Sequence, residues 1–150
     1  MEYQVIALDI YILSDSAAIW NALTNPDVTE QYWGKTRIES DWRAGSKIVY
    51  RRDGEVVDEH TILEVVPNVR LVHSFRPLFG EFKNEKESRI RIEIARGGSV
   101  CKVSLRHDDF QTESKVFQAC SVGWPMILSG LKTLLETGAP LPDFLPLAPA

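Results

Sequence analysis

Three side chains in the sequence could carry acid–base chemistry, and they are His107, Asp109 and Tyr50. Val103, Leu105 and His107 alternate along one strand-like run, so they share one face of the predicted strand. A neutral imidazole on an inward face could orient a ligand or move a proton. His107 is therefore the main candidate for catalysis. The alternative is a core histidine that is hydrogen-bonded to the backbone or to a neighbour such as Asp109.

The other two histidines, His60 and His73, fall on neighbouring predicted strands. Alternation places His60 on the same face as Asp58, and a hairpin turning at Pro67-Asn68 would bring His73 close to His60. A zinc site needs three or four clustered ligands, and the sequence supplies no third one here. We predict that His60 pairs with Asp58 on the surface and that no metal is bound.

Covalent catalysis finds no support in the sequence. Serine does not occur in a nucleophile-elbow context, and neither a glycine-rich phosphate loop nor a Cys-His pair at suggestive spacing is present. The enzyme class that remains is an acid–base cyclase, dehydratase or hydrolase. Such an enzyme needs only a shaped pocket and one or two ionisable groups, so no cofactor is predicted.

The hydrophobic pattern predicts one strand, two short helices, six more strands and a long C-terminal helix. Turn residues such as Asp53-Gly54 and Gly97-Gly98 separate the strands. Gly123-Trp124-Pro125 predicts a kink or a restart in the last helix, because proline lacks an amide hydrogen. The expected strands are 3–13, 36–40, 47–51, 57–66, 69–76, 85–96 and 99–109. The first expected helix follows a cap at Ser14 or Asp15 and ends at Asn25-Pro26, and the other two are 26–33 and about 113–137.

This element order predicts an α+β fold in which a curved, seven-stranded antiparallel sheet wraps around the long helix. A curved sheet and a single helix leave space between them, which can hold a ligand. Large aromatic residues collect at the ends of elements and on the inner helix face, where they either fill the core or line a cavity. The predicted cavity residues are Trp33, Trp42, Tyr50, Phe75, Phe79, His107, Phe110, Phe117, Trp124 and Leu128.

Composition limits the partners. A composition of 44% hydrophobic and 25% charged residues is typical of a globular protein. No apolar run is long enough to span a membrane. A net charge of −4 disfavours nucleic-acid binding, which needs clustered Lys and Arg. The N-terminus resembles no secretory signal, and Cys101 and Cys120 suit buried thiols, so we expect a cytoplasmic protein.

A series of short motifs, in order along almost the whole chain, resembles one family: the single-domain bacterial proteins related to the C-terminal domain of the activator of Hsp90 ATPase (AHSA1), within the START-like or SRPBCC superfamily of polyketide cyclases. Each fragment alone is weak, whereas the ordered set is specific. The motifs are Ile19-Trp20-Asn21-Ala22-Leu23-Thr24-Asn25-Pro26, Trp33-Gly34, Asp41-Trp42, Leu63-Glu64-Val65-Val66-Pro67, His107-Asp108-Asp109-Phe110 and Gly123-Trp124-Pro125.

The resemblance implies a helix-grip fold with a hydrophobic cavity, a single START-like domain over residues 1–140 and a Pro-rich tail over 141–150. The apolar inner faces and the aromatic residues predict binding, transport or sensing of a hydrophobic small molecule. The resemblance suggests a link to the stress response. Hsp90 activation is disfavoured, because in the eukaryotic activator it depends on an additional N-terminal domain. The apolar tail residues Leu141, Phe144, Leu145 and Leu147 could instead dock on a partner or form a homodimer.

Overall fold

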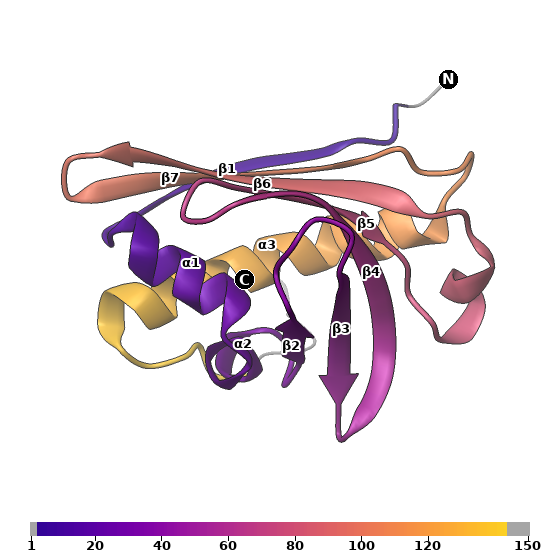
Figure 1. The fold of residues 1–150 in the computed structure, drawn as a ribbon, viewed down its shortest axis with the longest axis horizontal. Coiled ribbons are helices and arrows are strands. Elements are labelled where there is room, and N and C mark those ends of the chain that lie inside the picture. Colours follow the sequence, from indigo (N-terminus) through magenta and orange to yellow (C-terminus); the bar gives the residue numbers. More distant parts are fainter. Residues whose placement is uncertain (1–2, 144–150) are drawn as a thin grey trace, which may run out of the picture.

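The structure is a computed structural model that describes residues 3–143. Seven strands form one antiparallel sheet in the order β1-β7-β6-β5-β4-β3-β2, and the sheet bends around the long helix α3 (Figure 1). The predicted α+β helix-grip fold is therefore confirmed. The strands are β1 (Ile6–Ile12), β2 (Arg37–Ser40), β3 (Lys47–Arg52), β4 (Glu55–Val66), β5 (Arg70–Phe75), β6 (Ser88–Gly97) and β7 (Val100–Asp108).

Two short helices follow β1, as predicted, and each begins at a side-chain cap. Asp15 accepts a hydrogen bond from the backbone N–H of Ala18 at the start of α1 (Ser16–Thr24). Asn25 ends α1 and caps α2 (Pro26–Tyr32) by accepting from the N–H of Asp27. A short 3₁₀ helix, η1 (Gly80–Asn84), lies between β5 and β6 and was not predicted.

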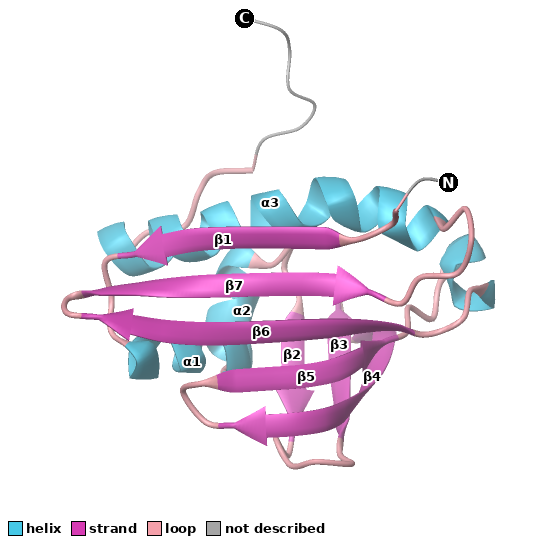
Figure 2. Ribbon diagram, turned by 90° about the horizontal axis from the view of Figure 1, so that it is seen from above, coloured by secondary structure: helices cyan, strands magenta, loops and turns pink. Residues whose placement is uncertain are grey.

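The helix α3 (Lys115–Thr137) runs without a break through Pro125, so the predicted restart did not occur. Proline removes only the hydrogen bond to the carbonyl of Ser121, and both residues are exposed, so water can satisfy that carbonyl. The helix begins at the cap Ser114 and ends at Gly138, whose φ of 82° suits glycine. Figure 2 shows α3 running along β1, behind that edge of the sheet.

Alternation along β6 and β7 separates core from solvent. Ile90, Ile92 and Ile94 are buried on β6, while Arg89 and Arg91 lie on its opposite, exposed face. On β7 the buried positions are Cys101, Val103, Leu105 and His107. The inward face of the sheet is therefore the one that the sequence pattern predicted.

The hairpin between β3 and β4 carries the polar residues of the site. Asp53 and Gly54 have φ values of 50° and 79°, which is the pair of positive angles that a type I′ turn requires. The turn pairs Arg52 with Glu55, and a register shift between Tyr50 and Arg51 then places Tyr50 opposite Asp58. Both side chains then lie on the inward face, next to the start of α3.

Candidate functional site

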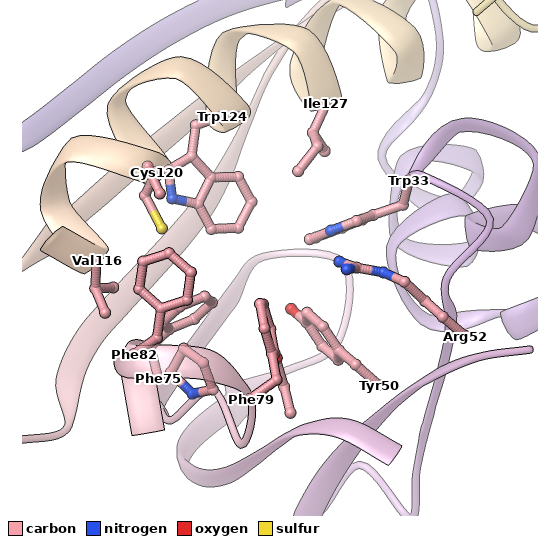
Figure 3. Close-up of a pocket in the computed structure, with 14 residues that line it drawn as sticks. Trp33, Tyr50, Arg52, Phe75, Phe79, Phe82, Val116, Cys120, Trp124 and Ile127 are labelled. Carbon is pink, nitrogen blue, oxygen red and sulfur yellow. The ribbon is translucent and has the colours of Figure 1, made fainter. Parts of the chain in front are cut away.

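A cavity of about 160 Å³ lies between α3, the β3–β4 hairpin and the segment that leads into η1 (Figure 3). Its walls are mostly aromatic and aliphatic. The lining residues are Trp33, Tyr50, Arg52, Asp58, Phe75, Pro77, Phe79, Phe82, Val116, Ala119, Cys120, Gly123, Trp124 and Ile127.

The α3 wall arises from helical spacing. Val116, Cys120, Trp124 and Ile127 recur every three or four residues, so they project from one face of the helix toward the sheet. Figure 3 shows their side chains directed into the cavity. Burial raises the pKa of the Cys120 thiol to about 12, so this wall carries no charge at neutral pH.

The opposite walls are built from aromatic contacts. The ring of Trp33 meets Trp124 edge-on at a centroid distance of 5.5 Å and Tyr50 at 5.8 Å. Phe79 and Phe82, 5.4 Å apart, close the side next to η1, and Phe79 is 41% exposed. The interior of the cavity is therefore lined by aromatic rings that pack against one another, and one wall is exposed to solvent.

The predicted cavity residues divide into two groups. Trp33, Tyr50, Phe75, Phe79 and Trp124 line the cavity. The others lie elsewhere: Trp42 borders a much smaller void behind Trp33, Phe110 and Phe117 line a surface depression near the N-terminus, and Leu128 and His107 are core residues.

Sequence reasoning missed several lining residues. Arg52 follows Tyr50 by two positions, and Asp58 lies opposite Tyr50 across the Asp53-Gly54 turn. The two-residue spacing from Tyr50 was the available signal for Arg52. Asp58 had no such signal, because it reaches its place opposite Tyr50 only through the register shift between Tyr50 and Arg51. Phe82 lies on the 3₁₀ helix, which has no periodic pattern to read.

His107 is a structural histidine rather than a group facing the cavity. The Nε1–H of Trp124 donates to its Nδ1 at 3.0 Å, so the ring proton is on Nε2, which lies 2.7 Å from the Ser88 hydroxyl. Burial lowers the pKa of His107 to about 3, so the imidazole is neutral at pH 7. Both ring nitrogens are occupied, and His107 acts by holding the Trp124 indole in the cavity wall.

The suggested partner of His107, Asp109, does not contact it. Asp109 sits beyond the end of β7 with a φ of 62°, and its carboxylate pairs with Lys86 at 2.9 Å on the surface. The tight turn after β7 points the Asp109 side chain away from the interior. Of the proposed acid–base groups, only Tyr50 reaches the cavity.

Replacing His107 with leucine should lower the free energy of unfolding by about 2–4 kcal/mol, because the Trp124 indole and the Ser88 hydroxyl both lose a buried partner. Urea unfolding followed by tryptophan fluorescence measures the change. Asp109→Asn is the control and should change the free energy by less than about 0.5 kcal/mol, because asparagine tolerates the left-handed backbone of this exposed position. A His107→Leu protein as stable as the wild type would contradict this role.

The prediction that His60 and Asp58 pair on the surface is wrong. Asp58 and His60 occupy alternate positions of β4 that face inward, and they are 4% and 0% exposed. The ring of His60 stacks on Phe75 at 4.7 Å and approaches His73 at 5.2 Å, so the predicted proximity of the two histidines is confirmed. The curvature of β4 buries a polar face that alternation alone could not assign to the inside.

Asp58 is the one acidic group in the cavity wall among the described residues. Its Oδ2 lies 3.3 Å from Nε2 of His60, but the geometry is not that of a hydrogen bond, and Oδ1 has no partner in the described part of the chain. Burial raises the pKa of Asp58 to about 7, and the positive charge of Arg52 opposes this rise. A carboxyl that titrates near neutrality can accept or donate a proton.

The neighbouring histidines stay neutral. Burial lowers the pKa of His60 to about 3, and burial together with the adjacent His60 lowers the pKa of His73 to about 3. The backbone N–H of Arg76 donates to Nδ1 of His60, so the proton of that ring is on Nε2. Nε2 lies 3.3 Å from Oδ2 of Asp58 and makes no hydrogen bond within the described residues.

Within residues 3–143, no group of three or more His, Cys, Asp or Glu side chains is placed to hold a metal ion. Over the same residues, no helix is both long enough and apolar enough to cross a membrane.

A family model described as "Activator of Hsp90 ATPase homolog 1-like protein" matches residues 15–136. The chain belongs to this AHSA1-like family. The match spans α1 through nearly all of α3, so the whole cavity of this AHSA1-like protein lies inside the family region. No curated protein sequence matches the chain.

Solved structures share the fold of this AHSA1-like chain. The solution structure of the Aha1 dimer from Colwellia psychrerythraea has a TM-score of 0.73 and 21% identity, covering 89% of this chain and 97% of that one. CalU16 from Micromonospora echinospora has a TM-score of 0.70 and 21% identity, covering 92% and 77%. DynU16, described as a putative protein in the dynemicin biosynthetic locus, has a TM-score of 0.76 and 16% identity, covering 93% of this chain and 49% of that one.

Proposed function

We propose that this protein binds a hydrophobic small molecule in the cavity between the sheet and α3, as a binding, transport or sensing module. The observation that carries the proposal is the aromatic lining of this cavity by Trp33, Phe75, Phe82 and Trp124. Ligand sites are concave and mostly apolar, with few polar groups that fix orientation. The cavity has this composition.

The volume of the cavity limits the size of the ligand that fits. Engineered apolar cavities of about 150 Å³ bind benzene, so 160 Å³ suits one ring with a small substituent. Drug-sized ligands need pockets of about 300 Å³ or more. A larger ligand would require the wall formed by Phe79 and Phe82 to move outward.

Titration with toluene tests the proposal. Toluene should bind saturably with a Kd of about 1 mM or tighter, because it desolvates apolar surface without a hydrogen-bonding cost. Fluorescence of Trp33 and Trp124 and backbone amide NMR shifts report binding. Shifts should concentrate around Val116, Cys120 and Phe75. A linear, unsaturable response, or shifts scattered over the surface, would contradict the proposal.

A second candidate is an enzyme of the cyclase, dehydratase or hydrolase type in the same cavity. The observation that favours it is Asp58, a buried carboxyl with a pKa of about 7 in the wall. The likeness to DynU16, described as a protein of a biosynthetic locus, supports the same candidate. If this is correct, a ligand recovered from the host is converted on incubation, and Asp58→Asn slows the conversion about 100-fold or more. Recovery of the ligand unchanged would contradict the enzyme hypothesis and leave the proposed binding function as the explanation.

Other expectations stay proposals. A cytoplasmic location and a link to stress are of this kind, and Hsp90 activation is not supported by any feature of the described residues. We also propose that this protein forms a homodimer, because the Aha1 of Colwellia psychrerythraea is described as a dimer. Light scattering that gives 17.0 kDa, the mass of one chain, would contradict a dimer. The tail residues Phe144, Leu145 and Leu147 lie outside the described residues.

A further inference from the structure

The cavity has one polar end. Tyr50 and Arg52 reach it from β3, and Asp58 reaches it from β4, where it pairs in register with Tyr50. Figure 3 shows the Tyr50 hydroxyl and the Arg52 guanidinium converging on the same side of the cavity, opposite Cys120 and Val116. The remaining walls are aromatic or aliphatic.

Asp58 is placed to accept a hydrogen bond from the cavity. Its side chain lines the cavity and is 5% exposed. Within the described residues neither carboxylate oxygen accepts a hydrogen bond, because Oδ1 is buried without a donor and Oδ2 lies 3.3 Å from Nε2 of His60 outside hydrogen-bond geometry. Buried carboxylates are almost always hydrogen-bonded, so a carboxylate in a cavity wall that accepts no hydrogen bond points to a ligand that supplies one.

The neighbouring charges restrict which donor fits. Arg52 and Asp58 line the same end of the cavity, so a ligand ammonium or carboxylate would meet one opposite and one like charge, and the repulsion offsets the attraction. A neutral hydroxyl meets no such repulsion. It can donate to Asp58 and can accept from the Tyr50 hydroxyl.

We propose that the cavity selects a single aromatic ring bearing a hydroxyl group, that is, a phenol, and that Asp58 accepts the hydrogen bond of this hydroxyl. The ring packs between Trp33, Phe75 and Trp124, and the hydroxyl lies at the polar end. This inference rests on the proposed ligand-binding function and names its ligand class.

Phenol, anisole and toluene provide the test, because all three carry one ring and only phenol has a hydroxyl donor. Dissociation constants are measured by NMR titration at pH 8. The wild-type protein should bind phenol about tenfold more tightly than anisole or toluene, as one net hydrogen bond to a charged acceptor implies.

Asp58→Leu should remove this preference, with phenol and toluene then binding within about threefold of each other. Asp58→Asn, which is nearly isosteric, covers the case in which Asp58→Leu fails to fold, and it should reduce the preference. Asp109→Asn removes an exposed carboxylate outside the cavity and should leave the preference unchanged.

The outcomes separate the two claims. Equal wild-type affinity for phenol, anisole and toluene overturns the phenol assignment and leaves the binding function intact. Saturable binding of none of the three overturns both. A phenol preference that survives in both Asp58 variants overturns the role of Asp58.

Discussion

Replacing Cys120 with phenylalanine should abolish toluene binding while leaving the fold at least as stable as that of the wild type. The Cys120 side chain points from α3 into the cavity, so a phenyl ring at this position occupies the ligand space (Figure 3). Filling a cavity typically raises the free energy of unfolding, here by about 1 kcal/mol. Toluene titration by NMR and urea unfolding measure the two effects.

Val122→Phe is the matched control. Val122 lies on the same helix but is 66% exposed and does not line the cavity. The added ring therefore stays in solvent, and toluene binding should persist. If Cys120→Phe binds toluene as tightly as the wild type does, the ligand site is elsewhere.

Asp58→Asn should stabilise the protein at pH 8 relative to the wild type, and the gain should shrink by about 3 kcal/mol between pH 8 and pH 5. The folded-state pKa of Asp58, about 7, lies above the ordinary value of 3.8 for an aspartate, so the native state holds the proton more tightly than the unfolded chain does. Raising the pH through this range therefore costs the wild type stability. Asparagine has no titrating proton, so its free energy of unfolding does not fall in this way as the pH rises.

Subtracting the two stability curves isolates Asp58 from the histidines. His60, His73 and His107 have low pKa values in the folded state, so they lower the free energy of unfolding as the pH falls below about 6.5. The wild type and Asp58→Asn both show this loss, and the subtraction removes it. The groups that face Asp58 are Tyr50 and Arg52 from β3, His60 from β4, His73 from β5 and Cys120 from α3. Urea unfolding at four pH values measures the difference, and a pH-independent difference would show that Asp58 titrates normally.

The architecture was predictable because strands with one buried face alternate and turns carry glycine, proline or asparagine. β6 and β7 each alternate over a full length, and Asp53-Gly54 marks the β3–β4 turn, so their pairing followed from local pattern. Helix α3 followed from its three- and four-residue repeat. The continuity of α3 at Pro125 did not follow, because it depends on exposure of the helix face.

The cavity was only half predictable, because aromatic residues mark the core without saying which part of the core stays open. Phe110 and Phe117 pack against each other at 5.3 Å near the start of α3, outside the cavity. Phe82, from a 3₁₀ helix without periodicity, lines it instead.

The polar residues were hardest to place. Asp58 and His60 on one face of a strand predict that this face is exposed to solvent. Only the curvature of the sheet turns the face inward. His107 was placed inward correctly, but its hydrogen bonds to Ser88 and Trp124 depend on contacts across β6 and α3 that no local pattern shows.

The most direct test of the central claim is a crystal structure of the protein soaked with iodobenzene, in which anomalous scattering locates the iodine. The account predicts an anomalous peak inside the cavity, between Trp33, Phe75 and Trp124, which is lost in Cys120→Phe. Crystals whose anomalous peaks all lie outside this cavity, in the wild type at saturating iodobenzene, would contradict the claim that it is a ligand site.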